Sequence, residues 1–310
     1  MKIAYVCYNI QKKYVSSSVV DEDNLLLDFL KNKGLDIHRE VWTNENINWS
    51  DYNLVLLKAP WDYHENITAF YNWLEKLKGL SIPMLNPYEI IKWNSDKHYL
   101  REISDAGLSV IPTIFIEKNS ALAIPSFFKH FNSEKLIIKP CISAGAKNTF
   151  ILTPDNFTLH QKNIEDLLKN EAFLVQPFIK EIVTEGEWSF IFFSGKYSHS
   201  VLKKPNSGDF RVQHTHGGTI HIEENNAIYI ATAKKFVDQF AKGCLYARVD
   251  GILVNNKFLL MELELIEPFL FLSYDAKSFD NYYDALLKLK SKVGSIKTCV
   301  SQEARAIENN

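Results

Sequence analysis

Residues 247–265 read ARVDGILVNNKFLLMELEL, two mainly apolar stretches separated by a short polar turn. The pattern predicts two strands joined as a hairpin, with Glu262 and Glu264 on the same face because alternate strand residues point the same way. Two adjacent carboxylates repel each other unless a cation compensates, and Mg²⁺ commonly binds through one or two carboxylates plus phosphates. Taken alone, the pair fits a solvated strand face equally well.

The length of the turn decides which residues meet across this hairpin. A two-residue turn would place Asp250 opposite Met261, whereas a three-residue loop at 255–257 places Asp250 opposite Glu262. We expect the three-residue loop, because it gathers Asp250, Glu262 and Glu264. The hairpin is therefore a candidate Mg²⁺ site with oxygen ligands only.

Two lysines upstream are candidate phosphate ligands. Lys97 lies at the start of a helix expected over 94–106, and Lys139 ends the apolar strand that precedes Pro140. A lysine at the end of a buried strand suits a phosphate as a point charge. The small residues Ala144 and Gly145 follow, and their backbone N–H groups can approach a phosphate closely. Each feature alone also fits a surface lysine or an ordinary turn.

A third segment has features suited to a nucleoside. Residues 174–179 read LVQPFI, an apolar strand that ends at Gln176 and continues as an extended linker. Backbone groups of Phe178-Ile179 can bond an adenine edge. Either Glu181 or Glu187 can accept hydrogen bonds from ribose hydroxyls.

In this order, the segments resemble the ATP-grasp superfamily, and within it the glutathione-synthetase-like branch. Lys203-Lys204-Pro205, Arg211 and Gly217-Gly218 match the spacing of that branch's Arg-x-Pro, Arg and Gly-Gly segment. Lysine at position 203 replaces arginine and loses a bidentate fork. Glu264 stands where the superfamily usually has asparagine, which adds a negative charge to the metal site.

Four phrases are similar to a narrower group, the O-ureido-serine cyclo-ligases of D-cycloserine biosynthesis. They are APWDY at 59–63, WNSDK at 93–97, GDFRVQ at 208–213 and ELELIEP at 262–268. The likeness suggests a subfamily, and it does not define the substrate.

The resemblance implies a role for each matched residue. Those expected to bind ATP are Lys97, Lys139, Ala144, Gly145, Gln176, Phe178, Ile179 and Glu187. Those expected to bind Mg²⁺ are Asp250, Glu262 and Glu264. Those expected to stabilise an acyl phosphate and the tetrahedral intermediate are Lys203, Arg211 and Arg248. Those expected to line the substrate pocket are Trp61, Asp62, Tyr63, Gly217 and Gly218.

The fold class is expected to be α/β, with α+β character in the ATP-grasp part. Strands near 2–8, 35–41, 53–58 and 82–85 alternate with helices near 20–33 and 66–78, which predicts a parallel sheet with helices on its faces. The expected domains are an N-terminal α/β domain at 1–93, a central lid subdomain at 94–184, a C-terminal subdomain at 185–295 and a polar tail at 296–310.

The composition limits the partners. The 310 residues are 46% hydrophobic and 23% charged with a net charge of -2, which argues against a nucleic-acid partner. We expect no signal peptide and no membrane partner, and dispersed cysteines indicate a reducing cytoplasm. Cys141 is expected to be a small buried residue rather than a reactive thiol. The resemblance leaves a homodimer open.

The leading functional hypothesis is a carboxylate–nitrogen ligase that uses ATP and Mg²⁺. It would form an acyl phosphate on a small carboxylate substrate, an amino-acid derivative or a short peptide, and could act intramolecularly as a cyclo-ligase. Two alternatives are a small-molecule kinase of the same superfamily and a nucleotide-binding module without catalysis. The presence of all three acidic positions argues against the last of these.

Overall fold

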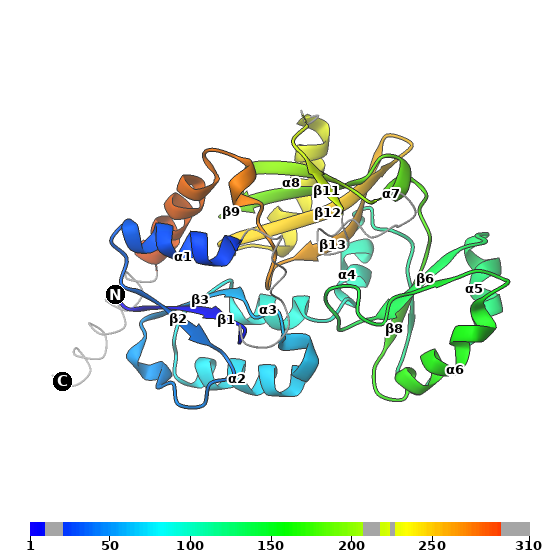
Figure 1. The fold of residues 1–310 in the computed structure, drawn as a ribbon, viewed down its shortest axis with the longest axis horizontal. Coiled ribbons are helices and arrows are strands. Elements are labelled where there is room, and N and C mark those ends of the chain that lie inside the picture. Colours follow the sequence, from blue (N-terminus) through cyan, green and yellow to red (C-terminus); the bar gives the residue numbers. More distant parts are fainter. Residues whose placement is uncertain (10–20, 207–217, 224–226, 293–310) are drawn as a thin grey trace.

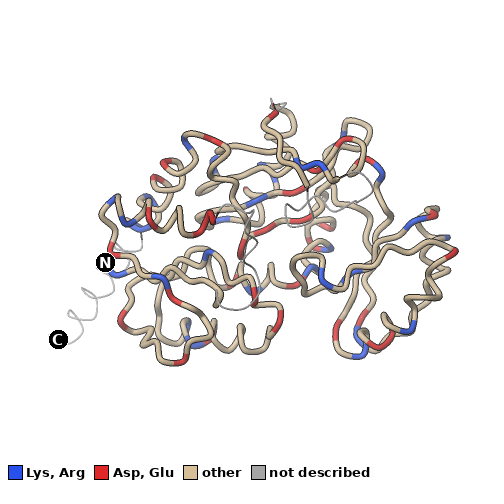
Figure 2. Tube along the Cα trace, viewed as in Figure 1, with Lys and Arg blue, Asp and Glu red and all other residues tan. Residues whose placement is uncertain are grey.

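A computed structural model describes residues 1–9, 21–206, 218–223 and 227–292 of the chain. The described chain folds around three sheets (Figure 1). Among the helices of these residues, none is both long and apolar enough to cross a membrane. Charged residues of both signs occur along strands as well as on the outer surface (Figure 2).

The first sheet is parallel, as its alternating strands and helices predict. Its strand order is β2-β1-β3-β4. The strands are β1 (Ile3–Cys7), β2 (Ile37–Val41), β3 (Leu54–Ala59) and β4 (Met84–Leu85). Helix α1 (Glu22–Asn32) covers one face and α2 (Ile67–Gly79) covers the other (Figure 1). Because both faces are covered, every residue of β1 and β3 is buried.

The second sheet is antiparallel, with the strand order β5-β8-β6-β7. The strands are β5 (Ile114–Ile116), β6 (Leu136–Pro140), β7 (Phe150–Leu152) and β8 (Phe173–Pro177). Helices α5 (Ile124–Phe131) and α6 (Phe157–Leu168) pack on it around one apolar cluster. The sequence analysis did not predict β7 and α5.

The third sheet is antiparallel, with the order β11-β10-β9-β12-β13. The strands are β9 (Glu187–Phe193), β10 (Lys196–Lys204), β11 (Thr219–His221), β12 (Tyr246–Val254) and β13 (Lys257–Glu264). Helix α8 (Ala227–Phe240) packs on one face. The other face shares a core with the first sheet and with the C-terminal helical residues 278–292. The hairpin expected over residues 247–265 is present.

The helix expected over 94–106 is present but begins later than predicted, at Tyr99 instead of Asn94. Helix α3 (Tyr88–Asn94) ends before a turn, and α4 (Tyr99–Asp105) begins after it. Asn94 does not cap a helix. Its buried amide donates to the carbonyl oxygen of Leu263 at 2.7 Å and accepts from the backbone N–H of Leu265 at 3.0 Å. The turn is therefore fixed against the end of β13, which places Lys97 beside the hairpin.

Candidate active site

The β12–β13 hairpin has the predicted pairing but not the predicted turn. The turn has two residues, Asn255 and Asn256, both with positive φ, and Val254 pairs directly with Lys257. The register shifts between Asp250 and Gly251, so that Asp250 nevertheless faces Glu262. The expected three-residue loop is wrong, because the extra residue is Met261 in a β-bulge within the strand.

Asp250 accepts hydrogen bonds from three directions inside this sheet. Ser189 Oγ lies 2.7 Å from its carboxylate, Lys203 Nζ lies 3.1 Å away and Arg248 Nη2 lies 2.9 Å away. Burial raises the pKa of the Asp250 carboxyl, but Arg248 and Lys203 outweigh burial and hold the pKa well below its usual range. Asp250 is therefore a buried, ionised carboxylate.

Lys203 and Arg248 connect Asp250 to two further carboxylates. Lys203 Nζ donates to Glu187 Oε1 at 2.5 Å, so the group expected to bind ribose is engaged by a lysine. Arg248 donates to a carboxylate oxygen of Glu264 and, through Nη1, to the carbonyl oxygen of Phe269 at 2.9 Å. These carboxylates raise the pKa of both basic groups despite burial.

Of the two candidate phosphate lysines, Lys97 pairs with Glu262 and Lys139 interacts with it electrostatically. Lys97 Nζ lies 3.2 Å from Glu262 Oε1 and donates to the carbonyl oxygen of Ser143 at 2.7 Å. Burial lowers the pKa of Lys139, Glu262 opposes that shift, and Lys97 adds to it. One charged cluster therefore contains Lys97 from the turn before α4, Lys139 from β6 and Glu262 from β13.

Residues 103–269, more than half of the chain, match the family model of the prokaryotic glutathione synthetase ATP-grasp domain. The chain belongs to the ATP-grasp family. It is an ATP-dependent ligase that forms carbon–nitrogen bonds. Residues 3–86 match a second model, the N-terminal domain of D-cycloserine synthetase DcsG.

Individual relatives agree with this family assignment. The cycloserine biosynthesis protein DcsG of Streptomyces lavendulae is 24% identical over 280 residues, which cover 84% of this chain and 91% of that protein. The crystal structure of D-cycloserine synthetase DcsG superposes with a TM-score of 0.81 at 22% identity, covering 93% of this chain and 100% of that one. The structure of D-alanine–D-alanine ligase from Bacillus anthracis, complexed with ATP, superposes with a TM-score of 0.69 at 15% identity, covering 96% of this chain and 99% of that one.

Among the residues that the structure describes, acidic groups outnumber basic ones in the cluster of this ATP-grasp ligase. The four basic residues are Lys97, Lys139, Lys203 and Arg248. The five carboxylates are Glu187, Asp250, Glu262, Glu264 and Glu267. Burial raises the pKa of Glu264 to about 8; Arg248 opposes this shift, while Asp250 and Glu262 add to it. Because its pKa is about 8, Glu264 holds a proton near neutral pH, and that proton offsets part of the excess of acidic groups.

Glu267 is a site residue that the sequence analysis did not select. Burial raises its pKa well above the usual range, and Glu264 and Glu262 raise it further. Its backbone carbonyl accepts from Trp61 Nε1 at 3.2 Å. The phrase ELELIEP contained the signal, a third acid three residues after Glu264.

The expected adenine segment is only partly available for a ligand. Gln176 is buried and donates to Thr113 Oγ1 at 2.9 Å. The backbone N–H of Phe178 already donates to the carbonyl oxygen of Lys135 at 2.8 Å.

In the small-residue loop after β6, Gly145 has a φ of +61° and open space where a Cβ would lie. That space is compatible with a close backbone approach.

The predicted pocket residues of the N-terminal domain differ in exposure. Trp61 stacks on Tyr8 with ring centroids 5.1 Å apart, and Asp62 accepts from Trp42 Nε1 at 2.6 Å. Tyr63 is 4% exposed and packs in the hydrophobic core beside Phe70, so it does not line an open pocket.

The glycine-rich segment before β11 is described only at its end. Gly218 is buried and directly precedes Thr219, the first residue of β11. The expectations for Arg211 and Gly217 lie outside the described residues.

Proposed function

We propose that this ligase activates the carboxylate of a small amino-acid derivative as an acyl phosphate and joins it to a nitrogen, releasing ADP and phosphate. The observation that carries the proposal is the ion pair of Lys97 with Glu262, which faces Asp250 and its network with Lys203 and Arg248. Lys139 lies within electrostatic reach of the same carboxylate. Phosphoryl transfer depends mainly on positive groups placed around the transferred phosphoryl.

The residues of the hairpin fit Mg²⁺. Asp250, Glu262 and Glu264 offer only carboxylate oxygens, which Mg²⁺ prefers, and they belong to two paired strands. Burial, together with the charges of Asp250 and Glu262, raises the pKa of Glu264, and a divalent cation would favour its ionised form. When bound, Mg²⁺ would supply positive charge to the ATP phosphates, and these three residues would hold it.

The chain's own residues have separate roles in this proposal. Lys97 and Lys139 hold the phosphates. Gln176 and the backbone at Phe178-Ile179 hold adenine. Glu187 binds ribose once its contact with Lys203 opens.

The positive charge at the reacting carboxylate comes from the other basic residues of the cluster. Lys203 and Arg248, with Arg211 from the segment between β10 and β11, stabilise the acyl-phosphate oxygens and the oxyanion formed by nitrogen attack. Trp61 and Asp62 are the N-terminal residues proposed to contact the remainder of the substrate.

Intramolecular ring closure is the form of this reaction that we favour. Its support is the match of both parts of the chain: residues 3–86 to the DcsG N-terminal domain and 84% of the chain to the DcsG protein. The substrate would then contain the carboxylate and the nitrogen in one molecule, as in O-ureido-serine. A homodimer in the cytoplasm remains compatible with this proposal.

The test combines product analysis with paired substrates. The enzyme is incubated with ATP, Mg²⁺ and either O-ureido-serine or pairs of separate amino acids, and phosphorus NMR follows the nucleotide. We expect ADP and phosphate in a one-to-one ratio with a cyclic product from the single substrate. AMP and pyrophosphate would exclude the acyl phosphate, and a stable phosphorylated hydroxyl would favour a kinase.

A further inference from the structure

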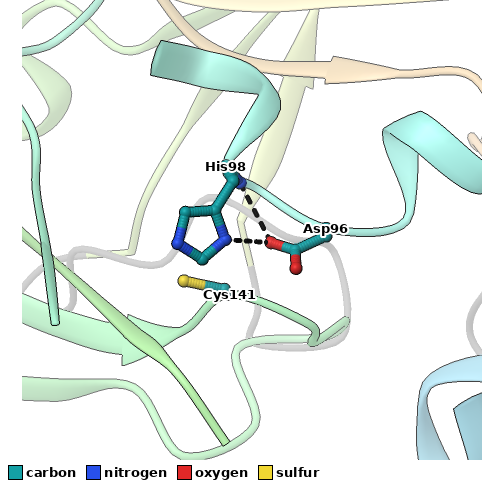
Figure 3. Close-up of side chains that lie close together, drawn as sticks. All are labelled: Asp96, His98 and Cys141. Atoms are coloured by element: carbon teal, nitrogen blue, oxygen red, sulfur yellow. Dashed lines mark hydrogen bonds and ion pairs between the residues drawn. The ribbon is translucent and has the colours of Figure 1, made fainter. Parts of the chain in front are cut away.

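A second group of polar side chains lies outside the charged cluster. Asp96 and His98 lie on either side of Lys97 in the turn before α4, and Cys141 directly follows β6 (Figure 3). One potential ligand atom from each of these three side chains lies within 4.8 Å of the other two. None of the three has a role in the proposed reaction.

The donor atoms differ in kind from those of the hairpin. A thiol sulfur, an imidazole nitrogen and a carboxylate oxygen together form the ligand set typical of Zn²⁺, whereas Mg²⁺ prefers oxygen alone. His98 is already oriented, because its Nδ1 lies 2.6 Å from Asp96 Oδ1 (Figure 3). A carboxylate that holds one imidazole nitrogen so that the other can bind a metal is a common feature of such sites.

The second nitrogen of His98 is the observation that points to a ligand. Nε2 is buried and has no hydrogen-bond partner. The carboxylate of Glu117 lies 3.4 Å from it, outside hydrogen-bonding geometry, and Glu117 is exposed enough to move toward a bound ion. A buried imidazole nitrogen normally has a partner, so this one is available to a metal.

The protein holds these groups together without a ligand. The His98 ring stacks on Phe115 with centroids 4.5 Å apart. The backbone N–H of Lys97 donates to the carbonyl oxygen of Cys141 at 2.9 Å, and the N–H of Cys141 donates to Ala172 at 2.9 Å. Ordering the site around an ion therefore requires little loss of conformational entropy.

We propose that His98 Nε2 and Cys141, with Glu117 as a further ligand and Asp96 orienting the imidazole through Nδ1, form a binding site for a divalent transition metal of the Zn²⁺ type. Binding replaces the thiol proton of Cys141, which is released to solvent, so affinity increases with pH. The ion would fix the turn that contains Lys97 to the end of β6, the strand that contains Lys139. The site is separate from the hairpin and does not depend on the proposed reaction.

The test uses the full chain after chelator treatment, titrated with Co²⁺ in excess Mg²⁺. We expect one equivalent of Co²⁺ to give a near-ultraviolet thiolate-to-cobalt charge-transfer band that Zn²⁺ removes. Cys141→Ser should abolish the band. His98→Gln should weaken binding by at least about 10-fold, the lower end for a lost outer-shell partner.

The matched controls are Cys244→Ser, another buried free thiol, and Cys299→Ser, both of which should keep the band. A band that survives Cys141→Ser, or wild-type protein that binds Co²⁺ without one, would overturn the proposal. His98 is partly exposed, so His98→Gln remains informative even if Cys141→Ser does not fold. Unchanged affinity in that variant would also overturn it.

Discussion

Asp250 faces Glu262 across the β12–β13 hairpin because Met261 is left unpaired in a bulge. The two-residue turn by itself would place Met261 opposite Asp250 and direct Glu262 to a different position. One extra residue within the strand restores the pairing of the two acids and increases the local twist. The geometry of the proposed metal site therefore depends on the bulge more than on the turn.

Gly251, the residue next to this bulge, should not tolerate a side chain. A Cβ there would lie 2.3 Å from the Phe258 ring and 2.5 Å from the carbonyl oxygen of Leu259. We expect Gly251→Ala to destabilise the protein by about 1–3 kcal/mol, as overpacking does, and to lower activity by displacing Asp250. Gly79→Ala, where no atom lies within 4 Å of the added Cβ, is the control. Equal denaturant midpoints for the two variants would contradict the prediction.

Glu262→Gln should remove turnover while leaving the fold intact. The change keeps the shape of the side chain but removes the charge that faces Lys97 and Lys139. We expect ADP formation to fall by more than about 100-fold, beyond the effect of a lost outer-shell partner of a metal. Glu89→Gln, an exposed acid on α3, should retain activity. Near-normal turnover of the Glu262 variant at saturating Mg²⁺ would rule out the metal assignment.

The sequence predicts most of this fold, because hydrophobic periodicity and the residues that end helices and form turns can be recognised within short segments. Such patterns predict the parallel sheet and the hairpin over 247–265. Together with the family resemblance, they also predict that one site contains Lys97, Lys139, Asp250 and Glu262. They do not predict the bulge, since Met261 fits a regular strand equally well. The break between α3 and α4 depends on a tertiary contact, the bonding of the Asn94 amide to β13.

Lys58 is another feature that the sequence does not reveal, since it looks like one polar interruption in an apolar strand. It is completely buried, and its Nζ donates to Asp23 Oδ1 at 2.9 Å and to the carbonyl oxygen of Pro268 at 3.1 Å. Glu22 lies 3.6 Å from it and accepts from the backbone of the segment that follows Pro268. These contacts join the N-terminal domain to the chain after the hairpin.

Lys58→Met should therefore destabilise the protein strongly. The variant leaves Asp23 and Glu22 buried without their cation, and we expect a loss of about 3–5 kcal/mol in the free energy of unfolding. Lys78→Met, which breaks an exposed pair with Glu89, should have little effect on stability. Guanidinium-induced unfolding measures the stability of both variants. If the two variants lose equal stability, the buried network does not have the role inferred for it.

Stability should also depend on the protonation of Glu264, whose pKa is raised to about 8 in the folded protein. The unfolded value is about 4.3, so between these two values the folded state binds a proton that the unfolded state does not. The contribution of Glu264 is fully present below about pH 4.3 and is lost as pH rises to about 8. Asp250 has a lowered pKa, so its contribution is lost only at more acidic pH and does not affect this window.

The matched variant Glu264→Gln removes this titration while other buried acids, such as Glu267, continue to titrate. We expect the free energy of unfolding to fall less steeply with pH in the variant than in the wild type, over about pH 5 to pH 8. Urea unfolding at several pH values measures the two slopes. If Mg²⁺ binds at the hairpin, it should also displace the proton of Glu264, which calorimetry in buffers of different ionisation enthalpy would detect as proton release near neutral pH. Parallel slopes in the two proteins would show that Glu264 titrates normally in the folded protein, which would contradict its raised pKa.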